Sequence, residues 1–246
     1  MDLTHAFDEG RHARAKIGFV LLATEQTIED DMYTMCPPGV GLHFTRADMP
    51  DSIKIDTFMK HAAELAPAAK RILPDGSLDV ICYACTSGSL VIGEERVMAE
   101  LSTGAPNATP TTLITGVLAA LKAIGAKRVA VATPYLDEIN TREADYMEAA
   151  GFEITDIQGL QLEKDSDMIR VRPEFIADFA RSVDTEDADA LFISCGALRT
   201  IDVLDALEQD LGKPVICSNQ AMMWDVLRKA GVTDKIRGYG QLLREY

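Results

Sequence analysis

Two cysteines stand at matching places in the sequence, each at the end of an apolar run. Cys85 ends "LDVICYAC" and is followed by "TSGS", while Cys195 ends "ADALFISC" and is followed by "GALR". A single cysteine at a strand end is usually a small core residue, but two at equivalent places favour a functional role. Two thiols on opposite sides of one carbon could act as base and acid. Alternatively, one could add covalently while the other transfers the proton.

The residues after each thiol supply hydrogen-bond donors. We expect a helix to begin just after each cysteine, which lowers the pKa of a thiol by stabilising the thiolate. The backbone N–H groups of Thr86, Ser87, Gly196 and Ala197 would be free at these helix starts. They could hold carboxylate oxygens, or the enediolate formed when a proton next to a carboxylate leaves. This chemistry requires no metal and no organic cofactor, and we predict neither.

Short β-rich runs alternate with helical stretches, which is typical of parallel α/β sheets. The predicted strands are 16–22, 40–45, 79–83, 128–132, 190–194 and 215–217. The predicted helices are 53–66, 89–101, 113–124, 140–150, 174–182, 201–211 and 220–230. The stretch "APNATP" is interpreted as a turn, and Ser218 or Asn219 is expected to cap the helix that follows.

An internal duplication underlies this alternation. "AKIGFVLLATEQT" and "AKRVAVATPYLDE", which start at Ala15 and Ala126, are separated by almost the same distance as Cys85 and Cys195. After each cysteine come a helix, a Gly-x-Pro turn and an Asn before another helix, so we infer two copies of one Rossmann-like α/β unit. Residues 1–115 with 222–246 would form the first domain, and residues 116–221 the second. Parallel sheets bind ligands at the carboxyl ends of their strands. Copies related by a pseudo-twofold axis would therefore point both thiols into one cleft.

The composition excludes several classes of partner. A net charge of −15 leaves no basic patch for nucleic acid or an anionic membrane. The N-terminus lacks the apolar core of a secretory signal, and the run "IGFVLLA" is too short to span a bilayer. Five cysteines, an odd number, without an export signal indicate reduced thiols in the cytoplasm. The predicted partner is a small carboxylate substrate, and a homo-oligomer is left open.

Other thiol chemistries fit the sequence less well. Cys82 and Cys85 have the spacing of a redox pair, but Cys82 lies inside the predicted strand instead of at a helix start. A phosphatase loop would need an arginine where Val91 stands. The four histidines show neither the spacing of zinc ligands nor the position of a hydrolase base.

Four segments carry a resemblance that covers nearly the whole chain. They are "LLATEQTIEDD", "YACTSGSLVIG", "VATPYLDEINTREADYMEAAGFEI" and "FISCGALRTIDVLDALEQDLGKPVICSNQAMMWDVLRKAG". With them the chain resembles the aspartate/glutamate racemase superfamily. Within it, the chain is similar to the branch of maleate cis–trans isomerases, arylmalonate decarboxylases and ectoine-utilisation racemase-like proteins.

The resemblance implies two similar α/β domains with a pseudo-twofold active site and no cofactor. The isomerases and racemases have cysteine at both positions, whereas the decarboxylases have glycine at the first. The presence of both Cys85 and Cys195 therefore favours racemisation or isomerisation. In maleate isomerases the first cysteine is the nucleophile and the second the proton donor, roles that map onto Cys85 and Cys195. The family's carboxylate-binding tyrosine matches Tyr135 in "TPYLDE".

One position departs from the maleate isomerases. They have Ser-Asn-Thr after the first strand, whereas this chain has "ATEQT", with Glu25 in place of the Asn. A carboxylate there would repel a second substrate carboxylate and attract an ammonium. We hypothesise that Glu25 shifts the preference towards an amino acid or an N-acylated amino acid. The alternative is a glutamate in a solvated loop or at a helix start.

The sequence thus predicts a cytoplasmic, cofactor-independent racemase or cis–trans isomerase that acts next to the carboxylate of a small amino or dicarboxylic acid. One alternative is a cofactor-free decarboxylase of the arylmalonate type. An alternative from another class is a small-molecule binding or sensor protein. The substrate, the stereochemical direction, the identity of the resting thiolate and the oligomeric state are left open.

Overall fold

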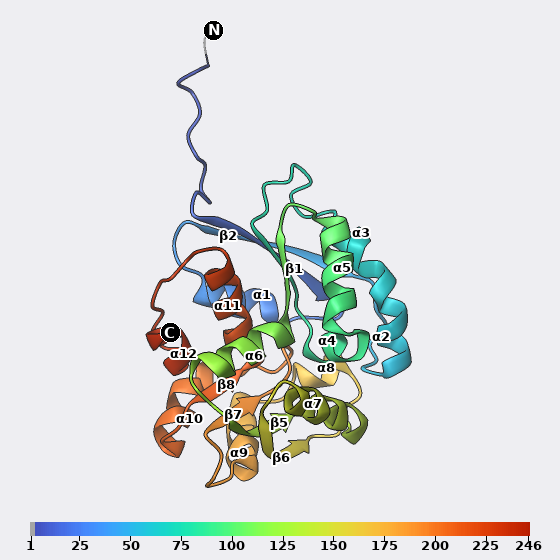
Figure 1. The fold of residues 1–246 in the computed structure, drawn as a ribbon, viewed down its shortest axis with the longest axis vertical. Helices are drawn as coiled ribbons and strands as arrows, with labels where there is room; N and C mark the ends of the chain where they lie inside the picture. The colour runs from blue at the N-terminus through green and yellow to red at the C-terminus, as the bar shows by residue number, and fades with distance from the viewer. Residues whose placement is uncertain (1–2) are drawn as a thin grey trace.

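Two parallel four-stranded sheets form the frame of the protein, in a computed structural model that describes residues 3–246 (Figure 1). The strands are β1 (Ala15–Leu22), β2 (Val40–Ala47), β3 (Val80–Tyr83), β4 (Thr109–Thr112), β5 (Arg128–Thr133), β6 (Glu153–Gly159), β7 (Ala190–Ile193) and β8 (Val215–Cys217). The orders β2-β1-β3-β4 and β6-β5-β7-β8 are the same arrangement used twice. The predicted parallel α/β fold with two similar sheets is confirmed.

Apolar runs place the inner strands in the core. All four residues of β3 and of β7 are buried, as is every residue of β1 except Lys16. Strands covered on both faces read as continuous apolar runs, which is why the sequence located them. The register aligns Tyr83 with Val20 and Thr112, so the segments after β1, β3 and β4 leave the sheet at one edge.

Helices connect the strands of both sheets. The α-helices are α1 (Ile28–Met35), α2 (Ile55–His61), α3 (Leu65–Ala69), α4 (Thr86–Ile92), α5 (Glu94–Gly104), α6 (Leu113–Ala123), α7 (Asp137–Ala149), α8 (Asp165–Met168), α9 (Pro173–Val183), α10 (Leu204–Leu211), α11 (Ser218–Lys229) and α12 (Gly240–Glu245). Two 3₁₀ turns, η1 (Ala62–Glu64) and η2 (Ile201–Val203), precede α3 and α10. No helix within residues 3–246 is both long and apolar enough to cross a membrane.

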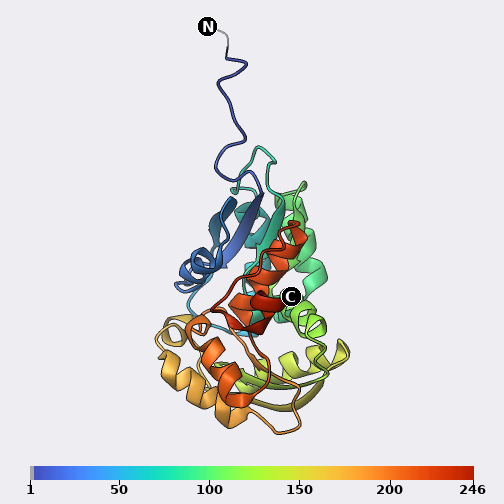
Figure 2. The ribbon, with the colours of Figure 1, turned by 90° about the vertical axis from the view of Figure 1, so that its left-hand side faces the viewer.

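Helices α6 and α11 pack against each other between the two sheets (Figures 1 and 2). Each contacts strands of both sheets, β4 and β8. Thr111 on β4 donates a hydrogen bond of 2.7 Å to Asp225 on α11, which ties this helix to the first sheet. Both predicted domain boundaries, after residues 115 and 221, fall inside this helix pair. The division into domains stays a prediction.

Two edge strands differ from the sequence prediction. β4 includes Pro110 and lies partly in the stretch interpreted as a turn, and proline is tolerated there because β4 is an edge strand. β6 was not predicted, because its residues are mostly half-buried and its sequence contains no apolar run. The single helix predicted over 89–101 is divided into α4 and α5 at Gly93, whose φ of +91° does not continue a helix.

Candidate active site

The carboxyl ends of four strands carry every site residue that the sequence nominated. They are Glu25 after β1; Cys85, Thr86 and Ser87 after β3; Tyr135 after β5; and Cys195, Gly196 and Ala197 after β7. All eight are buried, with the two cysteines 7% and 8% exposed. This is the edge at which parallel α/β sheets bind ligands.

Cys85 is the N-cap of α4. Its sulfur accepts the backbone N–H of Gly88 at 3.2 Å and lies 3.6 Å from Ser87 Oγ. Glycine is needed at position 88 because a Cβ there would overlap the hydroxyl of Tyr83. The helix start predicted directly after this thiol is confirmed.

Cys195 is held differently. Its φ of +91° lies in the left-handed region, which is strained for a residue with a side chain. No helix starts directly after it, because the next element is η2 at Ile201. The expectation that Gly196 and Ala197 begin a helix is wrong, since the left-handed backbone at Cys195 leads into a turn.

Side chains from other elements fix this turn. Asn219 donates to the Gly196 carbonyl at 2.8 Å, and Thr27 donates to the Ala197 carbonyl at 3.0 Å. The sulfur of Cys195 lies 3.9 Å from Met168 Sδ. The turn that carries the second thiol is therefore held by residues from both halves of the chain.

Ser218 joins the two thiol-bearing turns. Its hydroxyl accepts the backbone N–H of Cys195 at 2.9 Å and lies 3.1 Å from the Thr86 hydroxyl. The prediction that Ser218 or Asn219 caps α11 is wrong, because the sulfur of Cys217 accepts the Gln220 N–H instead, at 3.5 Å. The polar start of α11 is thus left free to hold the site together.

Tyr135 lies close to both thiols. Burial is the main cause that raises the pKa of its hydroxyl, and charges on Cys195 and Cys85 would raise it further. The Tyr135 hydroxyl in turn lowers the pKa of the Cys195 thiol by hydrogen bonding. One phenol is therefore coupled to both sulfurs.

Burial controls the ionisation of both thiols. It raises the pKa of Cys85 to about 12, against the opposing effects of the Gly88 N–H and the Ser87 hydroxyl. Burial likewise raises the pKa of Cys195 well above its usual value. The helix start lowers the pKa of Cys85 as expected, through the Gly88 N–H, but the net pKa is raised because desolvation outweighs this effect. Both thiols are therefore protonated at neutral pH in this arrangement.

Glu25 caps α1 from inside the protein. Its Oε1 accepts the backbone N–H groups of Gln26, Thr27 and Ile28 at 2.9, 2.5 and 3.0 Å. The side chain is 4% exposed, and burial raises its pKa to about 7, with a further increase from the charge of Asp165. Glu25 is therefore at a helix start, but it is not solvated.

Asp165 was not among the site residues predicted from the sequence. This residue begins α8, is 3% exposed, and accepts a hydrogen bond from Thr24 Oγ1 at 2.8 Å. Thr24 is the residue before Glu25, and Met168 of the same helix α8 lies 3.9 Å from the sulfur of Cys195, so Asp165 lies near both. Its charge would raise the pKa of Cys85, Cys195 and Glu25. The surrounding "LEKDSDM" looks like a charged surface loop, and only the tertiary fold buries the aspartate.

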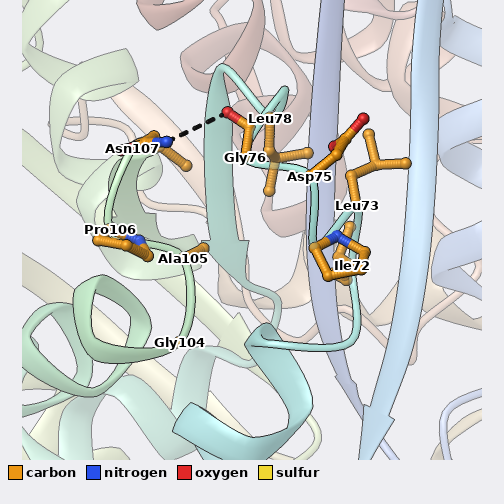
Figure 3. A pocket seen from close by; sticks show the side chains of 11 residues that line it. Ile72, Leu73, Asp75, Gly76, Leu78, Gly104, Ala105, Pro106 and Asn107 are labelled. Atoms are coloured by element: carbon orange, nitrogen blue, oxygen red, sulfur yellow. Dashed lines mark hydrogen bonds between the residues drawn. The ribbon is translucent and has the colours of Figure 1, made fainter.

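A cavity of about 190 Å³ lies at the opposite edge of the first sheet (Figure 3). It is lined by the turns that enter β3 and β4, where Asn107 donates to the Gly76 carbonyl at 3.4 Å. Asp75 is its one acidic side chain, and no thiol lines it. Because ligands bind at the carboxyl edge in this architecture, this cavity is not the candidate site.

Comparison with known proteins identifies the family of this chain. The arylmalonate decarboxylase family matches residues 50–243. The chain belongs to this family. The arylmalonate decarboxylase of Bordetella bronchiseptica is 34% identical over 212 residues, covering 84% of this chain and 85% of that enzyme. The maleate isomerase of Nocardia farcinica is 28% identical over 246 residues, covering 94% of this chain and 96% of that enzyme.

Solved structures of the family share the fold. A cysteine-to-serine variant of the Nocardia farcinica maleate cis–trans isomerase, with a covalently bound succinylcysteine intermediate, has a TM-score of 0.86. It is 26% identical and covers 94% of this chain and 99% of its own. The resemblance inferred from the four sequence segments, to the branch with maleate isomerases and arylmalonate decarboxylases, is confirmed.

Proposed function

We propose that this protein is a cofactor-independent isomerase or racemase that acts next to the carboxylate of a small acid, with Cys85 and Cys195 as its catalytic pair. The observation that carries the proposal is the hydroxyl of Ser218, which joins the two thiol-bearing turns through the Cys195 N–H at 2.9 Å and the Thr86 hydroxyl at 3.1 Å. Tyr135, whose pKa responds to the charge of both sulfurs, supports it further. The succinylcysteine of the Nocardia farcinica enzyme supports a reacting cysteine in this family.

The neighbouring groups have distinct roles in this proposal. Tyr135, with the N–H groups of Thr86 and Ser87, binds the substrate carboxylate, because first-turn N–H groups have no partner inside their helix. The N–H groups of Gly196 and Ala197, in the turn after β7, complete this carboxylate site from the second sheet. One sulfur, once deprotonated, attacks or takes a proton at the carbon beside the carboxylate. The other sulfur delivers a proton to it.

Decarboxylation of the arylmalonate type is the second candidate. The higher identity to the Bordetella bronchiseptica decarboxylase favours it. Cys85 argues against it, because the resemblance places glycine at that position in the decarboxylases. A sensor or binding protein would have no use for the coupled thiols.

Hydrogen exchange in D₂O tests the proposal. The enzyme is incubated with amino acids, dicarboxylates and arylmalonates, and NMR follows α-deuteration, geometric isomerisation and loss of CO₂. We expect Cys85→Ala and Cys195→Ala each to abolish exchange or isomerisation. The control is Cys36→Ala, which removes a half-buried thiol at the C-terminal end of α1. This variant should retain both exchange and isomerisation. Turnover that survives in either site variant would refute the two-thiol mechanism.

Three further expectations stay predictions. They are the cytoplasmic location, the link to ectoine utilisation, and the division of the chain into domains.

A further inference from the structure

Two buried carboxyls stand beside the thiols, each with one oxygen engaged and one unpartnered. Glu25 is 4% exposed and uses Oε1 to cap α1, while Asp165 is 3% exposed and accepts Thr24 Oγ1 through Oδ2. In the described part of the chain, Glu25 Oε2 and Asp165 Oδ1 accept no hydrogen bond. A carboxyl group has room for about four donors, so both groups retain capacity for a ligand.

The two carboxyls lie beside the turn that carries Cys195. Thr24, the residue before Glu25, holds Asp165, and Met168, on the helix that Asp165 begins, lies 3.9 Å from the sulfur of Cys195. Asp165 is close enough to raise the pKa of Glu25, and both would raise the pKa of Cys195. Asp165 acts on Cys85 in the same way. Two threonines close to Glu25 in the sequence stabilise this arrangement. The hydroxyl of Thr24 donates to Asp165, and the hydroxyl of Thr27 donates to the carbonyl of Ala197 in the turn after Cys195.

Among the described residues no cation contacts either carboxyl group. The pKa of the Arg46 guanidinium is raised mainly by its hydrogen bond to Glu29, and the charge of Glu25, which reaches Arg46, raises it further. Within residues 3–246, neither carboxyl forms an ion pair with Lys, Arg or His. Arg46 approaches Glu25, but it donates to the backbone carbonyl at 3.2 Å and to the carboxylate of Glu29. A third acid, Asp31, lies near Glu25 and is held by Asn219 at 2.7 Å. Buried acids without a partner are costly, which suggests that the partner arrives with the substrate.

We propose that Glu25 and Asp165 bind the ammonium group of the substrate, which makes the substrate a free amino acid. This inference rests on the proposed function, because it places the carbon that carries the ammonium between Cys85 and Cys195. An ammonium offers three donors and a positive charge to two carboxylates. A dicarboxylate would bring another negative charge to the same place. An N-acylated amino acid would bring no positive charge to offset the carboxylates.

The reaction then balances as a racemisation. The thiolate of one cysteine takes the α-proton, so that a C–H bond breaks and an S–H bond forms. The thiol of the other cysteine returns its proton to the opposite face of the planar intermediate. The two sulfurs exchange protonation states, and the amino acid leaves with inverted configuration.

Exchange and binding measurements separate this inference from the function on which it rests. Exchange of the α-proton in D₂O is measured for L-alanine, L-aspartate and their N-acetyl forms. Turnover is measured for maleate, and calorimetry measures the binding of all five compounds. We expect free amino acids to bind and exchange about 10- to 100-fold better than their N-acetyl forms. Glu25→Gln and Asp165→Asn should each reduce kcat/KM for free amino acids by about 10- to 100-fold and leave the N-acetyl forms almost unchanged. Asp30→Asn, an exposed acid on α1, is the matched control.

Three outcomes would overturn the ammonium site. Maleate turnover that needs both cysteines, with no binding of free amino acids, would keep the two-thiol function and refute this inference. Maleate binding that strengthens below pH 7 and is retained in Glu25→Gln would mean that neutral carboxyls hold a carboxylate instead. Equal losses for free and N-acetyl amino acids in both variants would assign the two acids a structural role. Calorimetry decides between these even if no compound turns over.

Discussion

Glu143 provides a stability test of how the second thiol is supported. This side chain on α7 is completely buried, and its Oε1 accepts a hydrogen bond of 2.6 Å from Ser194, the residue before Cys195. Its Oε2 is buried and has no partner among the described residues. Burial raises the pKa of Glu143 from 4.5 to about 7, against the opposing effect of Ser194.

The magnitude follows from linkage between proton binding and folding. The folded pKa lies above the unfolded pKa, so the folded state holds the proton more tightly. The stabilisation is complete below pH 4.5 and is lost as the pH rises through about 7. One pKa unit corresponds to about 1.4 kcal/mol, so ionising Glu143 should lower the free energy of unfolding by about 3 kcal/mol. Glutamine cannot ionise, and Glu143→Gln should remove this dependence.

Urea unfolding at pH 5, 6, 7 and 8, followed by far-UV circular dichroism, measures the effect. Glu25 and Asp31, whose pKa values are also about 7, titrate in both proteins and cancel in the difference. We expect the wild-type protein to lose about 2 to 3 kcal/mol more than Glu143→Gln between pH 5 and pH 8. Glu148→Gln, an exposed glutamate on the same helix, should parallel the wild type. Parallel profiles for Glu143→Gln and the wild type would refute the reasoning.

Two further predictions concern the thiols. Ser218→Ala removes the bonds to the Cys195 N–H and the Thr86 hydroxyl, so we expect a loss of about 1 to 3 kcal/mol in the free energy of unfolding and slower α-proton exchange. Unchanged exchange would show that the link between the turns is dispensable. Because burial raises the pKa of Cys85 to about 12, its alkylation by iodoacetamide, followed by mass spectrometry, should be slow at pH 7 and increase about tenfold per pH unit up to pH 10. Fast alkylation that does not depend on pH would contradict the buried geometry.

The sequence predicted the fold where the physics is local or repeated. Continuous apolar runs located β1, β3 and β7, and the duplication predicted two sheets of the same order. The edge strands β4 and β6 were missed, because a proline and half-buried polar residues give no strand pattern. Their pairing depends on the neighbouring strand, which a window of sequence does not contain.

The site was predictable to the same extent. Strand ends placed Cys85, Cys195 and Tyr135 at one edge, because parallel topology carries that information. Asp165 and Glu143 could not be found, since long-range packing makes them important: each belongs to a charged stretch and is buried by another element. The ionisation of the thiols also failed to follow from the sequence, because a helix start is visible there and the extent of burial is not.

The left-handed backbone at Cys195 makes the two sulfurs unequal partners. Cys85 has an extended backbone with φ of −148°, whereas Cys195 has φ of +91°. Glycine would relieve the second position, so a protein selected only for durability would discard this side chain before the other. Serine or alanine at 195 would remove the sulfur and keep the strained turn, whereas glycine would remove the strain as well and leave the turn free to adopt other conformations.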